Sequence, residues 1–403
     1  MFSADVKEKE ENHPCVRAFR SAWGHEPQDV LFCPYRIAPL GAHVDHQMGK
    51  VTGMAIDQGS RIAFEARGDA LIDLQSLNYQ PRMREDLRMC FYQKRGDWTD
   101  YVRGAVKVMM KRYGISRGIA GVLEGTLPAG GLSSSASVTI CVVRALAEAN
   151  EIRMDESALI SVAMQTENEF VGVRCGKLDP SCEVYSRKDH LLYLDCLTDA
   201  HRLISWPEKR LPFGIAVLFS GIRHSLVRSD YNRRREECVQ AAEQLVRYAG
   251  LESGIQAETV SLRDVPEKVF QAYGERLEAS IRKRAQHYYT EIRRVERGIE
   301  AWEKGDISSF GALMFESGKS SIDHYECGSE QMIALYRIMT ETDGIFGGRF
   351  SGAGFRGYCL ALTDPEKTED IAAKVREKYL KCYPGLEDRF LIRFCRSADG
   401  VVL

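Results

Sequence analysis

Short apolar runs and longer stretches with helical spacing follow one another along the chain. In the N-terminal part, apolar runs at 30–32, 61–64 and 71–74 are broken by Gly and Asp, which predicts β-strands. Apolar residues then recur at helical spacing, which predicts three helices, at 101–113, 134–150 and 156–171. The first half is therefore expected to combine a sheet with helices.

The second half shows the same mixture. Residues 213–219 are short, apolar and bounded by turns, which predicts a buried strand. They follow Trp206-Pro207, which we take as a domain boundary. Beyond them, the pattern predicts helices at 232–249, 280–304 and 329–340, and strands near 356–362 and 390–394. We expect an α+β fold with two domains, residues 1–207 and 208–403.

Length and charge restrict the possible partners. At 403 residues the chain can bury a large core, and its net charge of −2 gives no basic field for nucleic acid. The arginine-rich segments at 233–235, 282–284 and 293–294 alternate with glutamate, which predicts solvated helix faces rather than an RNA-binding patch. We expect no nucleic-acid partner.

The termini and cysteines indicate a cytoplasmic protein. Residues 1–11 are acidic and polar, and no apolar run approaches the ~18 residues of a membrane span. The 12 cysteines form no Cys-x-x-Cys pair and have no histidine at metal-ligand spacing. Free thiols in a reducing cytosol, with no membrane partner, are therefore expected.

Two glycines and three serines precede the helix predicted at 134–150, in the run 127–137. Glycines let the backbone approach a bulky anion, and the first amides of a helix lack intrahelical partners. Those amides and the helix dipole favour phosphate, and the serine hydroxyls could cap the helix, bond phosphate or complete a Mg²⁺ shell. No Gly-Lys-Ser/Thr follows, so the run is no Walker loop, and an ordinary helix cap stays open.

Three stretches, in order, resemble the signatures of the GHMP kinases. Pro128 and the run 131–136 resemble the second signature, residues 34–46 the first signature of the galactokinases, and residues 350–357 the third. Connecting segments at 98–104, 167–179, 223–238 and 284–294 also resemble galactokinases. The resemblance covers nearly the whole chain. It implies a two-domain GHMP kinase fold with the active site in the cleft between the domains, and ATP and Mg²⁺ as cofactors.

The resemblance also implies where the nucleotide and metal bind. Mg²⁺ would be held by Ser134 and Glu167, although a Glu in an amphipathic helix usually faces solvent. The residues implied for the nucleotide are Trp98, Pro128, Gly130, Gly131, Leu132, Ser133, Ser134, Ser135, Gly352 and Gly354.

Asp179 and Arg36 are the catalytic residues that the resemblance implies. Asp179 would orient the anomeric hydroxyl of a sugar, and whether it also removes the proton stays open because a loose transition state needs little help from a base. Arg36 would lie beside it, keep it ionised and shield the transferring charge. By residue type alone, an Asp before Pro begins a turn. The implied sugar contacts are His43, Asp45 and Tyr231, with Gly176 letting the backbone approach the ring.

The departures from galactokinases concern the sugar. At the position of Ala42, galactokinases carry a Glu that bonds the sugar's 6-hydroxyl. They also have Gly at the position of Tyr35, Tyr at that of His46 and usually Gln at that of Pro180. Two carboxylates about 4 Å apart repel by roughly 4 kcal/mol at an effective dielectric near 20, so an alanine here favours a sugar with an acid at C6. Arg174 is a possible bidentate partner for that acid, with Lys177 and Arg356 as further candidates.

Residues 36–47 and 350–357 look like those of the galacturonokinases, the uronate branch of the family. The expected reaction is transfer of a phosphoryl group from ATP to the anomeric hydroxyl of D-galacturonate. Two alternatives stay open: a repacked pocket that still takes galactose, and a non-catalytic sugar sensor. The intact glycine–serine loop disfavours the sensor. The sequence leaves the oligomeric state open, and a monomer is compatible with it.

Overall fold

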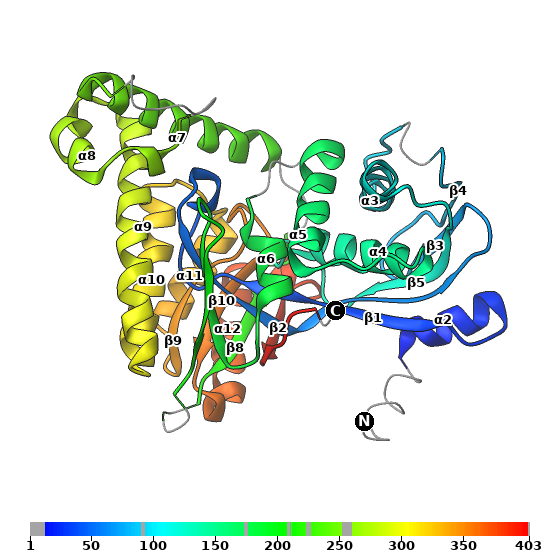
Figure 1. Ribbon diagram of the computed structural model, residues 1–403. Coiled ribbons are helices and arrows are strands. Elements are labelled where there is room, and N and C mark those ends of the chain that lie inside the picture. The colour runs from blue at the N-terminus through cyan, green and yellow to red at the C-terminus, as the bar shows by residue number, and fades with distance from the viewer. Residues whose placement is uncertain are drawn as a thin grey trace.

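The computed structural model describes residues 13–89, 93–172, 176–207, 210, 212–222, 227–251 and 260–401, with the backbone alone at 227–230. Arg174, the first candidate for a C6 acid, lies outside the described residues. Figure 1 shows the long strands β1 and β2 crossing the middle of the molecule. Helices α3 and α4 lie on one side of them, and the long helices α9 and α10 lie on the other.

The first sheet has eight strands in the order β4-β3-β5-β2-β6-β7, with β1 and β12 also paired to β2. Only the β3–β5 pair is parallel among the described pairings. The strands are β1 Asp29–Ile37, β2 Lys50–Ala66, β3 Leu71–Ser76, β4 Met83–Asp86, β5 Ile119–Gly125, β6 His190–Asp195, β7 His201–Ser205 and β12 Ser397–Ala398.

The second sheet is antiparallel, in the order β11-β8-β10-β9. Its strands are β8 Gly214–Phe219, β9 Ile345–Phe350, β10 Tyr358–Thr363 and β11 Leu391–Cys395. Strand β8 is buried at five of its six residues, which confirms the buried strand predicted at 213–219. The strands predicted near 356–362 and 390–394 are confirmed as β10 and β11.

Helices cover the sheets, and those predicted from helical spacing are present. The helices are α2 Pro14–Trp23, α3 Thr99–Tyr113, α4 Ser134–Ala149, α5 Glu156–Gln165, α6 Leu178–Tyr185, α7 Val227–Ala249, α8 Glu267–Tyr273, α9 Ala279–Glu303, α10 Ile307–Asp323, α11 Glu330–Thr340 and α12 Thr368–Cys382. One prediction needs refinement. The helix expected at 156–171 is α-helical to Gln165 and then widens into a π-helical turn, Thr166–Val171.

An irregularity in the β1–β2 pairing, with its extra residues on β2, lies beside the first motif. The pairing of β1 with β2 shifts register between Pro34 and Tyr35. Proline has no N–H to give to the ladder, and bulges redirect the following side chains. Pairing resumes with Arg36 opposite Ala55, and the backbone N–H of Arg36 donates to the Leu132 carbonyl in the glycine–serine loop.

One hydrophobic cluster joins the two sheets. It combines Tyr35 and Ile37 of β1 with Val217 and Phe219 of β8 and with Trp302 of α9. The last strand, β12, also returns to the first sheet. The change of sheet falls between β7 and β8, near residue 207, but the halves share a core. The domain ranges 1–207 and 208–403 stay predictions.

The prediction of solvated arginine faces is wrong at two positions. Arg284 is fully buried and donates through Nε to Glu237 Oε2 at 2.6 Å and through Nη2 to Glu326 Oε2 at 2.7 Å. Arg294 is also buried and donates to Glu291 Oε2 at 2.7 Å. Carboxylates from α7, α9 and the segment after α10 neutralise these guanidiniums, so they can leave water.

The cysteines are mostly core residues. All ten described cysteines are unpaired, and nine of them are buried. The expectation that the cysteines have no histidine at metal-ligand spacing needs one correction, because donor atoms of His13, Cys15 and Glu124 lie within 4.8 Å of one another. Burial lowers the pKa of His13 to about 4 and raises that of Cys15 to about 12. The imidazole of His13 and the thiol of Cys15 are therefore both uncharged near pH 7. Among the described helices, none is both long and apolar enough to cross a bilayer.

Candidate active site

The three motif stretches meet at one carbonyl group, that of Gly131. Arg36 Nη1 donates to it at 2.7 Å, and Ser351 Oγ donates to it at 2.7 Å. The backbone N–H of Arg36 also donates to the carbonyl of Leu132 at 3.3 Å. Residues from β1, from the loop before α4 and from the loop after β9 are thereby fixed relative to one another.

Glycines allow these loops to touch through their backbones. Gly131 has φ +99°, and a Cβ there would lie 2.7 Å from the Ser351 carbonyl oxygen. A Cβ at Gly352 would lie 2.7 Å from Gly131 Cα, and one at Gly357 would lie 1.9 Å from the Gly130 carbonyl oxygen. No side chain fits at such distances. At Gly354 the excluding neighbour is Cys327 Sγ, at 2.8 Å.

The start of α4 has the geometry of an anion seat. Ser133 precedes the helix with φ +64°, a strained value for serine, and its side chain makes no cap hydrogen bond. Ser134 and Ser135 occupy the first turn, where the helix leaves its amides without intrahelical partners. The hydroxyl of Tyr358 donates to the Pro128 carbonyl at 3.1 Å, and the Leu132 side chain is buried in the core.

A cavity of about 540 Å³ opens in front of this helix start. Its volume lies in the range of small-molecule sites. Trp98, Ser134 and Ser135 line it, as predicted for nucleotide contacts, together with Tyr35 and Tyr101. Trp98 Nε1 donates to the Pro81 carbonyl at 3.0 Å, which fixes the indole at the cavity edge.

A second cavity, of about 330 Å³, adjoins the first, since Tyr101, Ser135 and Arg356 line both. It gathers most of the residues predicted for catalysis and sugar binding. The catalytic and sugar candidates that line it are Arg36, Ala42, His43, Asp45, Gly176, Asp179, Tyr231 and Arg356. Four of the nucleotide candidates also line it: Gly130, Gly131, Ser135 and Gly352.

Arg36 and Asp179 form a two-pronged ion pair in this second cavity. Arg36 Nε lies 2.7 Å from Asp179 Oδ1, and Nη2 lies 2.8 Å from Oδ2. Burial opposes the charge on Arg36, but the Asp179 carboxylate outweighs it and raises the pKa of the guanidinium. Asp179 does not begin a free turn, as its place before Pro180 could suggest, but lies in the first turn of α6. Proline is tolerated in a first turn because no intrahelical N–H bond is lost there.

Asp45 lies in the same cavity, at the start of a short 3₁₀ helix, Asp45–Gln47. Burial raises the pKa of its carboxyl to about 6, and the charge of Asp179 adds to that rise. A Cβ at Gly176 would lie 2.0 Å from Asp45 Oδ2. The absence of a side chain at Gly176 therefore makes room for Asp45.

His43 is a neutral ring held by its neighbours. It stacks on Tyr325 with ring centroids 4.0 Å apart and an interplanar angle of 2°. Its Nε2 lies 3.5 Å from Cys327 Sγ. Burial lowers the pKa of His43 well below its usual value, and His287, Arg349 and His46 lower it further. The ring can therefore both donate and accept a hydrogen bond near pH 7.

The loop that carries Ala42 is fixed from α9. The backbone N–H groups of Gly41 and Ala42 both donate to Glu291 Oε1 at 2.9 Å. His287 Nε2 donates to the Ala42 carbonyl at 2.8 Å. Two residues of the segment 284–294, Glu291 and His287, thus position the loop that carries Ala42.

Acidic residues gather behind the start of α4. Glu167 is buried in the π-helical turn, a kind of distortion often found at functional sites. Glu183, one turn beyond Asp179 in α6, is fully buried. Burial raises the pKa of Glu183 well above its usual value, and the charges of Asp179 and Glu167 add to this. Carboxylate and hydroxyl oxygens are the donors that Mg²⁺ prefers, so Glu167 and the Ser134 hydroxyl have the donor types that fit the ion.

Tyr101 and Arg349 line these cavities but were not singled out from sequence. Glu183, which is buried in α6 and interacts with Asp179, was not singled out either. Tyr101 stands in a segment that resembles galactokinases, which was a usable signal. Arg349 directly precedes the 350–357 loop, but nothing in the sequence marks it as buried. The same holds for Glu183, which occupies a helix position without any motif.

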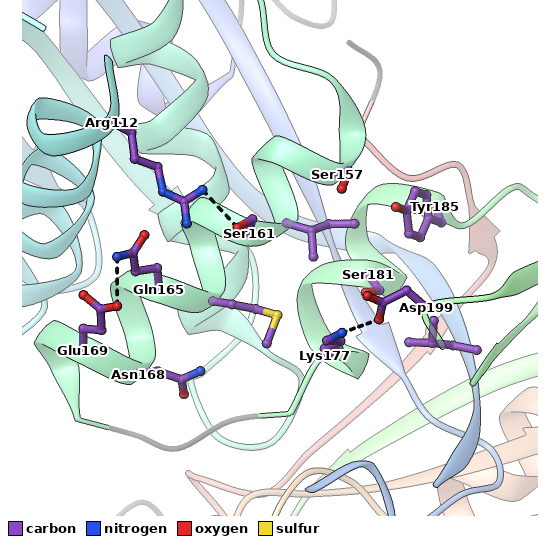
Figure 2. A pocket seen from close by; sticks show the side chains of 13 residues that line it. Arg112, Ser157, Ser161, Gln165, Asn168, Glu169, Lys177, Ser181, Tyr185 and Asp199 are labelled. Carbon is purple, nitrogen blue, oxygen red and sulfur yellow. Dashed lines mark hydrogen bonds and ion pairs between the residues drawn. The ribbon is translucent and has the colours of Figure 1, made fainter. Parts of the chain in front are cut away.

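Figure 2 shows a third cavity, of about 480 Å³, on the outer side of α5 and α6. Lys177 lines it and forms an ion pair with Asp199 there. Lys177 does not line the cavity of Ala42. Of the two described cations considered for a C6 acid, Lys177 and Arg356, only Arg356 lines that cavity.

Comparisons with known proteins agree with this geometry. Three family models match the chain: the GHMP kinases N terminal domain over residues 100–187, the GHMP kinases C terminal over 299–381, and the galactokinase galactose-binding signature over 17–66. The chain is 38% identical over 401 residues to a galacturonokinase of Arabidopsis thaliana, with 92% of each protein covered.

Solved structures show the same fold. The galactokinase of Lactococcus lactis, complexed with galactose, superposes with a TM-score of 0.86 at 24% identity, covering 96% of this chain and 98% of that one. The mevalonate kinase of Methanococcus jannaschii gives a TM-score of 0.66 at 16% identity, with coverage of 92% and 98%. The chain belongs to the GHMP kinase family, among the sugar kinases that resemble galactokinase.

Proposed function

We propose that the protein transfers a phosphoryl group from ATP to the anomeric hydroxyl of D-galacturonate. The observation that carries this is the meeting of strand β1 and two loops at the Gly131 carbonyl. It places an anion seat at the start of α4 beside a smaller cavity that holds the Arg36–Asp179 pair. A nucleotide in the larger cavity would point its phosphates at a sugar in the smaller one.

Phosphoryl transfer depends mainly on positioning and on neutralising charge. Asp179 would accept a hydrogen bond from the anomeric hydroxyl and align it with the γ-phosphate. Arg36 fixes both carboxylate oxygens and brings a positive charge next to the transferring group. The amides at the start of α4 and the glycine loop 351–357 would bind the phosphate oxygens. Ser133, Ser134 and Ser135 supply hydroxyls at this place.

Ser134 and Glu167 would hold Mg²⁺, with the nucleotide phosphates completing its shell. The ion supplies charge neutralisation at the phosphates when it is bound. The fit rests on the donor types, a buried carboxylate at Glu167 and a hydroxyl at Ser134 in the first turn of α4. Burial raises the pKa of Glu183 and so disfavours its charged form, and Glu183 is therefore not counted as a ligand.

Galacturonate is favoured over galactose by Ala42. Ala42 lines the smaller cavity and brings no carboxylate to repel a C6 acid. The galacturonokinase of Arabidopsis, 38% identical to this chain, supports the same substrate. The second candidate is galactose, supported by the match to the galactose-binding signature and by the likeness to a galactokinase.

His43, Asp45 and Tyr231 would contact the sugar hydroxyls in this arrangement. The Trp98 indole and the loop residues Pro128 to Leu132 would border the nucleotide. We place the enzyme in the cytoplasm, where its unpaired thiols would stay reduced. It would act as a sugar kinase without nucleic-acid or membrane partners. The two domains would divide at residue 207.

The product identifies the reaction. Incubation with Mg-ATP and D-galacturonate should give one new sugar phosphate, which ³¹P and ¹³C NMR should place on C1. The matched control is the methyl glycoside of galacturonate, which has no free anomeric hydroxyl and should give no product. Phosphorylation of the glycoside, or a phosphate on another carbon, would overturn the assignment of the anomeric hydroxyl.

A further inference from the structure

Arg349, in β9, is a buried cation in the wall of the sugar cavity. It is 2% exposed and lines the same cavity as Ala42 and His43. Its Nη1 donates to the Ala38 carbonyl at 2.7 Å, but its Nε has no hydrogen-bond partner among the described residues. A buried guanidinium with an unused donor is costly unless an acceptor or an anion meets it.

The Glu291 carboxylate acts most strongly on the charge of Arg349, but both of its oxygens already accept hydrogen bonds from other groups. Its Oε2 pairs with Arg294 at 2.7 Å. Its Oε1 accepts from the N–H groups of Gly41 and Ala42 and from Ser317 Oγ at 2.7 Å. This cluster thus holds two guanidiniums for one carboxylate. In agreement, burial lowers the pKa of Arg349, and the Glu291 charge offsets that effect only in part.

Ala42 leaves a place for the missing anion. Its N–H and its carbonyl are both held by α9, so the direction of its Cβ is fixed. Where this chain has Ala42, galactokinases carry glutamate. The smaller side chain therefore removes a carboxylate from the wall of a cavity that still contains a buried guanidinium.

The other cations near the cavity have different surroundings. Arg36 uses Nε and Nη2 on Asp179 and Nη1 on the Gly131 carbonyl. Lys177 pairs with Asp199 on the outer side of α6, as Figure 2 shows. Arg356 lines both cavities and so stands where the phosphates and the sugar would meet.

We propose that Arg349 binds the C6 carboxylate of the sugar acid, in the space that Ala42 leaves open. The inference rests on the proposed function, because it assigns the specificity of the same site. A guanidinium presents its donors in a planar fork that matches a carboxylate. A sugar acid would supply both the missing charge and the missing acceptors, whereas the hydroxymethyl group of galactose would supply only a weak acceptor.

The test compares ligands that differ only in charge at C6. Binding of galacturonate and of its C6 methyl ester is measured by calorimetry for the wild type and for Arg349→Met. The variant should bind galacturonate about 10- to 100-fold more weakly, the usual effect of losing a charged hydrogen-bonded partner. Binding of the ester should change far less. Equal losses for both ligands, or no loss for either, would overturn the assignment.

Two further variants keep the test decisive. Ala42→Glu places an internal carboxylate beside Arg349, so it should weaken galacturonate binding by a similar factor and spare galactose, even where Arg349→Met does not fold. Unchanged galacturonate binding in Ala42→Glu would contradict the proposal. Arg284→Met is the matched control, because Arg284 is a buried arginine outside the cavity. It should lower stability and leave the preference for galacturonate over the ester unchanged.

The two proposals fail in different ways. A wild-type protein that phosphorylates no sugar acid would remove the proposed function. A wild type that phosphorylates galacturonate, and variants at positions 349 and 42 that keep the same preference, would leave that function intact and remove only the role of Arg349.

Discussion

At the scale of single residues, the sugar cavity contains two carboxylates, Asp179 and Asp45, whose surroundings differ. Asp179 has both oxygens in the fork of Arg36. Asp45 is packed against Gly176, and burial raises the pKa of its carboxyl to about 6. Neighbouring acids in such different settings can take different roles. We assign the paired acid to the reacting hydroxyl and the other to binding the ring.

Removing either member of the Arg36–Asp179 pair should abolish most turnover. Asp179→Asn and Arg36→Ala should each lower kcat by about 10²- to 10⁴-fold, the usual range for a positioned acid–base group. Nucleotide affinity should change little, because neither side chain lines the larger cavity. ADP release measures the first effect and calorimetry the second. Asp199→Asn, which alters the ion pair with Lys177 outside both cavities, should keep its kcat, and near-normal turnover in Asp179→Asn would refute the assignment.

Asp45 should make stability depend on pH in a definite direction. Its pKa is 3.8 ordinarily and about 6 when folded, so the folded protein takes up this proton first as the pH falls. The group therefore costs stability above pH 6, and this cost disappears as the pH falls from 6 towards 4. Asp45→Asn should raise the free energy of unfolding at pH 7 by about 1–3 kcal/mol and by much less at pH 4.

Chemical denaturation at the two pH values measures this difference. Asp69→Asn serves as a control of opposite sign, because hydrogen bonding to Arg67 lowers the pKa of Asp69 to about 2. That variant should be less stable than the wild type at pH 7. A constant difference between Asp45→Asn and the wild type across the pH range would contradict the buried setting of Asp45.

At the scale of elements, the site depends on loops in backbone contact. The glycine–serine loop before α4 touches the glycine loop after β9, and Arg36 of β1 donates to the Gly131 carbonyl at this contact. The loops leave no space for side chains at Gly131, Gly352 and Gly357. Close contact at this seam fixes the distance between the anion seat and the sugar cavity.

Gly131→Ala should therefore damage activity more than backbone strain alone would. The new Cβ would lie 2.7 Å from the Ser351 carbonyl oxygen and force the loops apart. Gly114→Ala is the matched control, because Gly114 also has a positive φ, +64°, but nothing lies within 4 Å of its Cβ position. Both variants should lose about 1 kcal/mol of stability from the strained backbone. Only Gly131→Ala should lose most of its kcat, measured by ADP release, and equal activities would show that the contact is unimportant.

Sequence patterns predicted the elements that obey local rules. The helices around 101–113, 134–150 and 280–304 and the buried strand β8 have clear periodicity. The pattern did not show that β2 is a single strand of 17 residues, because its glycines suggested breaks. Four neighbouring strands, β1, β5, β6 and β12, pair with it and hold it extended.

Tertiary contacts also explain why helix α10 and some residues of the site were not predicted from the sequence. Gly311 counts against a helix by propensity, yet a Cβ there would lie 2.0 Å from the Phe346 carbonyl oxygen, so glycine lets α10 pack on β9. The motif residues of the site were predicted because their spacing is local. Arg349 and Glu183 were not, since their burial depends on segments far away in the sequence.

At the scale of the whole molecule, the two adjoining cavities lie where the two halves share their core. Tyr35 of β1 lines the nucleotide cavity and also packs in the cluster that contains Phe219 and Trp302. Arg349 and Gly352 reach the sugar cavity from the second sheet, while Asp179 and Ala42 reach it from the first half. The site therefore requires both halves in one fixed arrangement. The central claim is that this arrangement transfers phosphate to a sugar acid.

The most direct test is ADP release by the purified full-length protein with Mg-ATP and, separately, galacturonate, glucuronate, galactose and glucose. We expect kcat/KM to be highest for galacturonate and at least about tenfold lower for galactose, as the loss of one charged contact implies. Preference for galactose would move the protein to the neutral-sugar kinases. No ADP release with any of the four sugars would contradict the account.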